Sequence, residues 1–570
     1  MQLTKTPDLP VPARRRLPEA FDPADTAALD AHARDLLQSE IGSAADLRAW
    51  IEDWSELEGS VWGEYSRRAT AFDRNTADSE LRDRATTFEA DVMPLWETCE
   101  DKLVRRFLAS PFAGELGPDY EVFRRDRVRN TEIFREENTP LLADDRRICN
   151  EWKEVQGAVL VELDGEKLTP AACVARYRHP DRSVRKTAFL GLARRRAEDR
   201  EKIDALFDEL LALRHKIARN AGYENFRDYT YAKMHRFDYT PQDCAGYHAG
   251  VENVLAPVSR ALAQQRRETL GLDRLRPWDN YVNLHAPSSE PLFRDEKSYI
   301  GFTRRLFEAV DPSFASDFDI LIRNGLLDLM ARPGKSPGAY NCMVADMRLP
   351  FIFGNAAGTA RDVEMLLHEG GHAFHSIAAR ELEPLAYAFS PAEFAEVASM
   401  TMEHFGVERL GHACDEEQAR ALSYEHFESS LMILPRIALV DAFEHWVFTQ
   451  TGHTADERRR KWAELTARFL PWVDWSGHEA DRDDSWQGII HLFTHPLYYI
   501  SYGIAELGAL RLWRNEQRDH DETVAAYRRA LALGGSRPLP ELYETAGITF
   551  GMDEAVFQDI VPAVRDRLLS

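Results

Sequence analysis

The chain has 570 residues, of which 44% are hydrophobic and 10% aromatic, so it can bury a large core and is not a disordered chain. Its 71 basic and 95 acidic residues give a net charge of −24, which disfavours nucleic acid and anionic membrane surfaces as partners. The six cysteines stand apart, with no C-x-x-C pair, and this predicts reduced thiols and a cytoplasmic location. We also expect no signal peptide and no membrane-spanning helix, because no segment is apolar enough for either.

Helical signals dominate the chain from its N-terminal part onward. Ser43 and Asp46 form a capping box, and Thr240-Pro241 places a hydroxyl before a helix-starting proline. A long amphipathic run from about Ser183 predicts a helix that ends at Ala221-Gly222. We expect a boundary near residue 170, which separates an N-terminal helical region, residues 1–170, from a second region, residues 171–570.

Strand signals are few. Val159–Leu163 and Glu166–Leu168 flank Asp164-Gly165, a pair that is typical of a hairpin turn. Ala339–Val344 and Leu349–Phe353 form a second candidate pair. The sequence therefore predicts a mainly α fold with little sheet.

One segment combines a helix start with a metal-binding pattern. Thr359 and Asp362 form a capping box, so a helix is predicted over about residues 360–376. On this helix His368 and His372 lie one turn apart on one face, where both imidazoles can bind a single zinc ion.

Glu369 completes the H-E-x-x-H pattern. It lies beside the histidine pair, from where its carboxylate can take a proton from a water molecule without binding the metal itself. The alternative is a surface helix with two stray histidines. The helix cap, the flanking apolar residues and a downstream acid argue against that alternative.

A zinc site needs a third protein ligand. His375 lies two turns from His368, too far for both to meet one ion together with His372. Ala378 stands where an H-E-x-x-H-x-x-G-x-x-H site has its last histidine, so that type of site is excluded. An acid from the next helix is the option that remains.

That next helix is predicted to begin at Ser390-Pro391, with Ser390 as N-cap and Glu393 as its capping partner. Glu396 lies in the second turn among small and apolar residues, and metal ligation would explain a buried acid there. Glu403 shares the face of Glu396, and it is either a partner of the site or an ordinary surface acid.

The segment His368–His375, followed by Glu396, resembles the zinc site of the oligoendopeptidase F and thimet oligopeptidase family. The resemblance covers roughly residues 170–570 and is closest to the bacterial branch. The other segments that match the family are Ala221–Tyr229, Lys335–Tyr340, Pro350–Phe353, His491, Pro496–Gly503, Leu542-Tyr543 and Ala546–Ile548.

This resemblance implies roles for a late group of His and Tyr residues. His491 and Tyr502 are the candidates to stabilise the oxyanion that forms during peptide hydrolysis. The family's second tyrosine corresponds to Tyr498 or to Tyr499. His495 has no counterpart in the family and is not expected to be catalytic.

The resemblance also implies an architecture and an activity. The fold would be a large multi-helix, zincin-type peptidase, with a deep substrate channel between two helical halves and a small β-sheet beside the active-site helix. The enzyme would hold one zinc ion per chain with His368, His372 and Glu396. It would hydrolyse internal bonds of short unfolded peptides, with Glu369 as base. The strand Leu349–Phe353 could pair with the substrate backbone.

Two alternatives stay open at this point. A zinc aminopeptidase shares the ligand pattern but would need a G-x-M-E-N type motif where this chain reads PFIFGN. A non-catalytic helical peptide-binding protein is the second alternative, against which the presence of Glu369 argues. The oligomeric state is not predicted.

Overall fold

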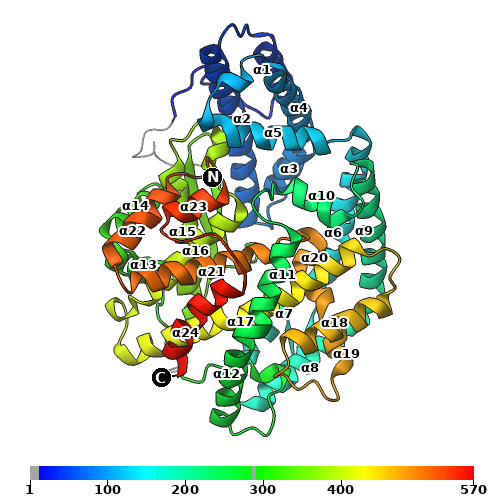
Figure 1. The fold of residues 1–570 in the computed structure, drawn as a ribbon, viewed down its shortest axis with the longest axis vertical. Helices are drawn as coiled ribbons and strands as arrows, with labels where there is room; N and C mark the ends of the chain where they lie inside the picture. The colour runs from blue at the N-terminus through cyan, green and yellow to red at the C-terminus, as the bar shows by residue number, and fades with distance from the viewer. Residues whose placement is uncertain (1–11, 164, 286–290, 570) are drawn as a thin grey trace. The chain divides into compact units, whose positions relative to one another are not determined.

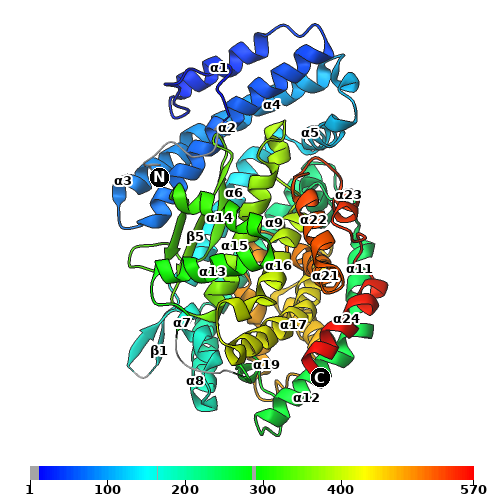
Figure 2. The ribbon, with the colours of Figure 1, turned by 90° about the vertical axis from the view of Figure 1, so that its left-hand side faces the viewer.

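The computed structural model describes residues 12–163, 165–285 and 291–569, and it is built mainly from helices (Figures 1 and 2). This confirms the mainly α fold. Among the residues described, no helix is both long and apolar enough to cross a membrane. The chain divides into two compact units: unit 1 comprises Met1–Thr131, Ser288–Ser423 and Gly508–Phe550, and unit 2 comprises Glu132–Pro287, Tyr424–Leu507 and Gly551–Ser570.

Unit 1 contains a three-stranded sheet and the helices that pack on it. Its elements are α1 (Thr26–Gln38), α2 (Ala44–Arg74), α3 (Ser79–Thr87), α4 (Met93–Ala109), α5 (Glu121–Ile133), α13 (Glu296–Val310), α14 (Pro312–Arg323), β3 (Leu327–Met330), β4 (Tyr340–Val344), β5 (Leu349–Ala356), α15 (Ala360–Ala379), α16 (Ala392–Val407), α22 (His520–Leu531) and α23 (Leu539–Thr545).

The described residues of unit 2 are helical apart from one hairpin. Its elements are α6 (Thr139–Gly157), β1 (Val161–Leu163), β2 (Glu166–Leu168), α7 (Pro170–Ala175), α8 (Arg182–Glu198), α9 (Arg200–Asn220), α10 (Phe226–Lys233), α11 (Pro241–Gly250), α12 (Ala256–Thr269), α18 (Ala455–Phe469), α19 (Glu479–Asp483), α20 (Ile490–Thr494) and α24 (Glu554–Leu569). Three helices contain residues of both units: α5, whose last two residues belong to unit 2, α17 (Glu416–Thr449) and α21 (Tyr499–Glu516).

The N-terminal helices of unit 1 share an aromatic core. Helices α1, α2 and α4 lie side by side (Figures 1 and 2), and their buried faces meet around Trp50, Trp54, Trp96 and Phe107. These are large side chains at helical spacing, so their burial accounts for much of the stability of this part.

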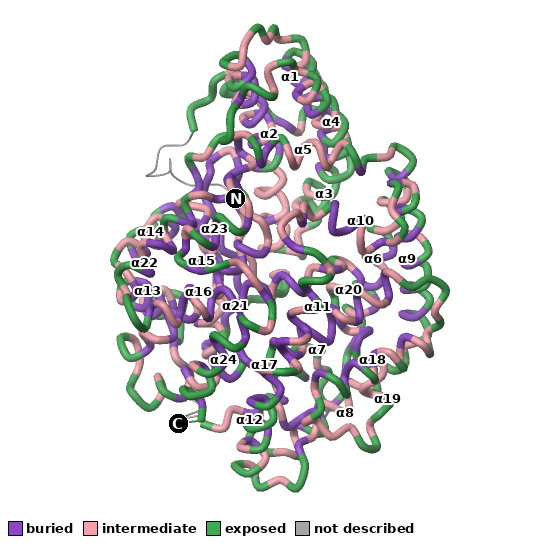
Figure 3. The backbone as a smooth tube through the Cα atoms, in the orientation of Figure 1, coloured by how far each residue is buried: buried purple, intermediate pink, exposed green. Residues whose placement is uncertain are grey.

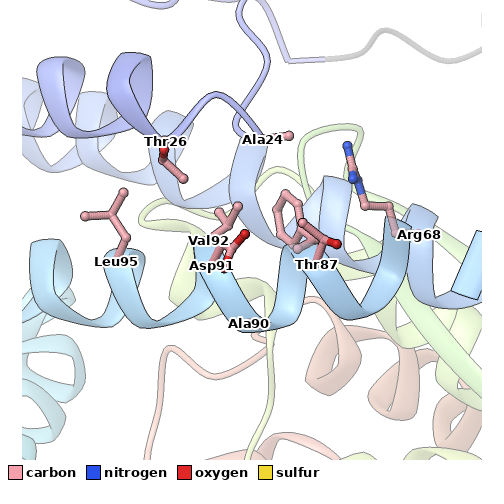
Figure 4. A pocket seen from close by; sticks show the side chains of 9 residues that line it. Ala24, Thr26, Arg68, Thr87, Ala90, Asp91, Val92 and Leu95 are labelled. Atoms are coloured by element: carbon pink, nitrogen blue, oxygen red, sulfur yellow. The ribbon is translucent and has the colours of Figure 1, made fainter. Parts of the chain in front are cut away.

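Figure 4 shows a pocket against these helices, lined by Ala24, Thr26, Arg68, Thr87, Phe88, Ala90, Asp91, Val92 and Leu95. None of these lining residues belongs to the metal-binding pattern.

The sheet of unit 1 has the strand order β3-β5-β4. The predicted pairing of β4 with β5 is confirmed: the two strands are antiparallel, with Val344 opposite Leu349. The parallel strand β3 was not predicted. Because β5 has a neighbour on each side, the hypothesis that Leu349–Phe353 pairs with a substrate strand is wrong.

Several local predictions are confirmed. Ser43 caps α2, and the Asp46 carboxylate accepts a hydrogen bond from the Ser43 hydroxyl at 2.9 Å. The capping box at Thr240 is present at the start of α11. β1 and β2 pair as an antiparallel hairpin, with Gly165 at φ +82° in the turn, while Asp164 lies outside the described residues. The left-handed φ at Gly165 is why glycine suits that position.

Two helix boundaries differ from the predictions. The run from Ser183 to Ala221 is not one helix, because α8 ends at Glu198 and α9 begins at Arg200. Helix α16 begins at Ala392, one residue later than predicted, with Pro391 at the N-cap position. The Ser390 hydroxyl has no hydrogen-bond partner within the described part of the chain, so Ser390 does not cap this helix with Glu393. Proline already fixes the backbone at the helix start.

Candidate metal centre and active site

Helix α15 carries the metal-binding pattern, and its start is fixed by its own sequence. The Asp362 carboxylate accepts hydrogen bonds from the Thr359 amide at 2.7 Å, the Thr359 hydroxyl at 2.9 Å and the Ala357 amide at 3.0 Å. The predicted capping box and the predicted helix are therefore confirmed. Helix α15 packs against β5 (Figure 2), and many of its residues are buried (Figure 3).

Two glycines inside the pattern allow neighbouring helices to approach α15 closely. A Cβ atom at Gly371 would lie 2.6 Å from both the Ala398 carbonyl oxygen and the Ser399 Cα of α16. A Cβ atom at Gly370 would lie 2.5 Å from the ring of Phe307 on α13. Glycine at position 371 therefore lets the backbone of α16, and with it Glu396, lie next to the histidines of α15, and glycine at position 370 leaves room for the Phe307 ring of α13.

The three predicted metal ligands come together within unit 1. The Oε2 atom of Glu396 lies 3.5 Å from Nε2 of His368 and 3.8 Å from Nε2 of His372. One ligand atom from each of the three residues lies within 4.8 Å of the others. Two imidazole nitrogens and one carboxylate oxygen at this spacing fit a catalytic zinc ion, which leaves a coordination position open for water or substrate.

Glu403 orients the first histidine. Its Oε1 atom lies 2.6 Å from Nδ1 of His368, so Nε2 of the same ring is directed at Glu396. Carboxylates commonly hold metal-binding histidines in this way. Of the two interpretations of Glu403, the structure thus supports the partner of the site over the surface acid.

The two histidines have opposite electrostatic environments. Burial by itself lowers the pKa of His368, but the hydrogen bond to Glu403 and the charge of Glu396 together raise it to about 9. Burial and the charge of His368 lower the pKa of His372 well below its usual value. His372 is therefore neutral and ready to bind a metal, whereas His368 must release a proton to do so.

Glu369 is buried next to these ligands. Burial, opposed by the charge of His368, raises the pKa of Glu369 to about 7. One hydrogen bond to its carboxylate comes from the backbone N–H of Asn341 on β4, and its Oε2 atom has no hydrogen-bond partner among the described residues. A carboxyl group with a pKa near neutrality and one unpaired oxygen is suited to accept a proton and to return it. The contact with Asn341 was not predicted, because it uses the backbone and leaves no signal in the sequence.

His375 and Glu393, which the sequence analysis did not predict as metal ligands, lie outside the group of predicted ligands. His375 is buried against Phe394, and burial lowers its pKa to about 4. Glu393 is buried at the start of α16 and makes no hydrogen bond with the Ser390 hydroxyl. His375 is not among the three residues, His368, His372 and Glu396, whose ligand atoms lie close together, which agrees with its exclusion as a ligand.

The late His and Tyr residues form a cluster within unit 2. The hydroxyl of Tyr502 lies 3.4 Å from Nε2 of His491, and the rings of Tyr498 and Tyr499 have their centroids 5.3 and 5.9 Å from that of Tyr502. Burial lowers the pKa of His491 to about 4, so its ring is neutral. The Tyr499 hydroxyl is hydrogen-bonded to the Arg436 guanidinium. The catalytic roles of these residues stay predictions.

Comparison with known proteins gives consistent matches. Group B oligopeptidase PepB of Streptococcus agalactiae is 23% identical over 416 residues, which are 66% of this chain and 62% of that protein. An oligoendopeptidase F homolog of Borreliella burgdorferi is 21% identical over 79% of this chain and 76% of its own. The solved structure of PZ peptidase A with an inhibitor has a TM-score of 0.89 and 25% identity, and it covers 96% of this chain and 97% of its own.

The chain spans less than two thirds of the length of the Streptococcus relative. A family model covers much of this chain: the model of peptidase family M3 matches residues 177–561, a range that contains the three predicted ligands, Glu369 and the late tyrosines. The chain therefore belongs to peptidase family M3.

Proposed function

We propose that the chain is a zinc-dependent endopeptidase that hydrolyses internal bonds of short, unfolded peptides. The observation that carries this proposal is a buried carboxylate, Glu369, with one unpaired oxygen, beside two histidines and an acid at metal-ligand spacing. The relatives named oligopeptidase and oligoendopeptidase support the same class of substrate.

His368, His372 and Glu396 would hold the zinc ion, and Glu403 keeps the His368 ring in the orientation that this requires. When bound, zinc supplies a Lewis acid that polarises the attacking water and the scissile carbonyl. Glu369 accepts a proton from the attacking water and later gives it to the leaving amine. We assign to His491 and Tyr502 the donation of hydrogen bonds to the oxyanion, with Tyr498 as their companion.

Tyr498 is favoured over Tyr499 as the companion by a contact. The Tyr499 hydroxyl is hydrogen-bonded to Arg436, which ties it to a structural partner. We also propose a cytoplasmic location for the enzyme, since its six thiols are free, as is typical of proteins in reducing compartments.

A zinc aminopeptidase is the second candidate, because it uses the same ligand set. The two candidates are separated by a quenched peptide whose N-terminus is acetylated, assayed with the zinc-loaded chain, after chelation, and after zinc is restored. We expect internal cleavage, its loss on chelation and its recovery with zinc, while a folded protein stays intact. Release of N-terminal residues from unblocked peptides alone would favour the aminopeptidase. No cleavage of any peptide by the zinc-loaded chain would favour a peptide-binding protein.

A further inference from the structure

A second group of metal-ligand side chains lies in unit 2, on helices α11 and α17. Each helix presents two such residues one turn apart: Cys244 and His248 on α11, and Asp441 and His445 on α17. Residues four apart share one face of a helix, so two pairs can converge where the helices meet. None of these residues belongs to the peptidase site described above.

The geometry of the group suits a metal ion. The Sγ atom of Cys244, a carboxylate oxygen of Asp441 and a ring nitrogen of His445 all lie within 4.8 Å of one another. Cys244 and Asp441 are fully buried, and His445 is partly buried. The hydroxyl of Tyr231 adjoins the same point, 3.1 Å from Sγ of Cys244 and 3.4 Å from Nε2 of His445.

Asp441 supplies the second, independent observation. Its Oδ2 atom lies 2.8 Å from Nε2 of His248 and 3.4 Å from Nε2 of His445. Its Oδ1 atom has no hydrogen-bond partner in the part of the chain that the structure describes, although the side chain is 0% exposed. A buried carboxylate oxygen without a partner is costly, and a cation is the partner that would satisfy it.

We propose that Cys244, Asp441 and His445 bind a second divalent transition-metal ion of the zinc class, and that His248 holds the Asp441 carboxylate in place. One sulfur, one nitrogen and one oxygen ligand favour zinc or cobalt and disfavour magnesium and calcium, which prefer oxygen ligands. The Cys244 thiol gives up its proton to solvent on binding, as metal-binding thiols do.

Charge balance supports this assignment. A thiolate and a carboxylate together carry two negative charges, which a divalent ion neutralises, so the metal-bound group can be buried without a net charge. A tetrahedral ion would need a fourth ligand, which the Tyr231 hydroxyl, close to Cys244 and His445, or a water molecule could supply. The ion would join α11 to α17 and so stabilise unit 2.

The test uses cobalt, because a thiolate bound to cobalt gives an intense near-ultraviolet charge-transfer band. The proposed peptidase ligands include no sulfur, so they cannot produce that band. The full chain with His372→Ala, which removes a ligand of the peptidase site, is stripped with a chelator and titrated with Co²⁺. We expect the band to saturate at about one equivalent, and the wild-type chain to hold about two zinc ions.

The matched variants are Cys244→Ser and Cys173→Ser. Cys173 is also a fully buried cysteine of unit 2, but it is not in the metal-ligand group. The band should vanish in the first variant and persist in the second. If Cys244→Ser fails to fold, His445→Gln replaces it, since His445 is only partly buried; this variant keeps the sulfur but loses a ligand, so the band should need more than one equivalent of Co²⁺ to saturate.

No charge-transfer band in the titrated His372→Ala chain, or a band that persists in Cys244→Ser, would overturn the proposal. The group would then be a hydrogen-bonded network that joins two helices. Neither outcome affects the peptidase proposal, which the acetylated-peptide assay tests separately.

Discussion

The two histidines of α15 are one turn apart, yet their surroundings give them different protonation states. Glu403 and Glu396 favour the charged form of His368, whereas burial and the charge of His368 keep His372 neutral. Metal binding must therefore displace a proton from His368, and zinc affinity should fall as the pH decreases through the pKa of about 9. The acid that orients His368 should therefore also contribute to zinc affinity.

Glu369→Gln keeps the shape and polarity of the side chain but removes its ability to accept a proton. We expect kcat to fall by roughly 10²–10⁴-fold, with zinc content and melting temperature close to wild type. Steady-state kinetics on the acetylated peptide, together with metal analysis, measure this. A variant with nearly normal kcat would exclude Glu369 as the base.

Tyr502→Phe removes one hydroxyl and little volume. If this hydroxyl stabilises the oxyanion, kcat should fall by about 10²-fold while KM changes little. Tyr498→Phe should lower kcat in the same way. Tyr499→Phe is the matched control: because its hydroxyl contacts Arg436, we expect a loss of stability with kcat retained. Normal kcat in Tyr502→Phe with a lower melting temperature would mark Tyr502 as structural.

At the scale of elements, the close contact between α15 and α16 brings the three predicted metal ligands together. Gly371 has no side chain, so the backbone of α16 at Ala398 can lie against α15. This places Glu396, on the second helix, within reach of the histidines on the first. The glycine is thus part of the site, although it contacts no metal or substrate.

Gly371→Ala should push α16 away from α15. We expect a loss of roughly 1–3 kcal/mol in the free energy of unfolding and weaker zinc binding. Gly301→Ala is the matched control, because a Cβ atom there would meet only the Arg305 guanidinium, at 3.9 Å. In the interior of α13 that change should stabilise the chain slightly, since alanine is the better helix former. Chemical denaturation and zinc titration measure both effects, and equal zinc affinity in the two variants would contradict the role given to Gly371.

At the scale of the whole molecule, each unit contains one of the two groups of His, Cys, Asp and Glu side chains that could hold a metal ion among the described residues. The proposed peptidase ligands lie in unit 1, and the cysteine-containing group lies in unit 2. An ion that binds only the folded state stabilises that state by mass action. Because the chain has two compact units, its unfolding need not be a single two-state transition.

Removal of metal should therefore lower the melting temperature, and zinc should restore it. Free zinc at about 1,000 times its dissociation constant corresponds to about 4 kcal/mol of stabilisation for one site. His372→Ala should lose the part of this increment that belongs to unit 1 and keep the rest. Differential scanning calorimetry with and without chelator provides the measurement. A melting temperature that does not respond to chelation would show that neither group binds metal tightly.

The features that the sequence by itself determined are those whose hydrogen bonds and spacings are local. The capping box of Thr359 and Asp362 and the one-turn spacing of His368 and His372 depend on residues at most four apart. The hairpin of β4 and β5 likewise joins neighbouring segments. Glu396 could be proposed because a buried acid requires a partner.

Other features were decided only by the tertiary structure, because they join segments that are distant in the sequence. The partner of Glu403, the backbone donor from Asn341 and the parallel strand β3 depend on which elements pack together. Cys244 and Asp441 lie on helices nearly 200 residues apart in the sequence. The residue pair on either helix gives no sign of which other helix it will meet. Local patterns fix helices and caps, whereas long-range packing determines which side chains share one buried space.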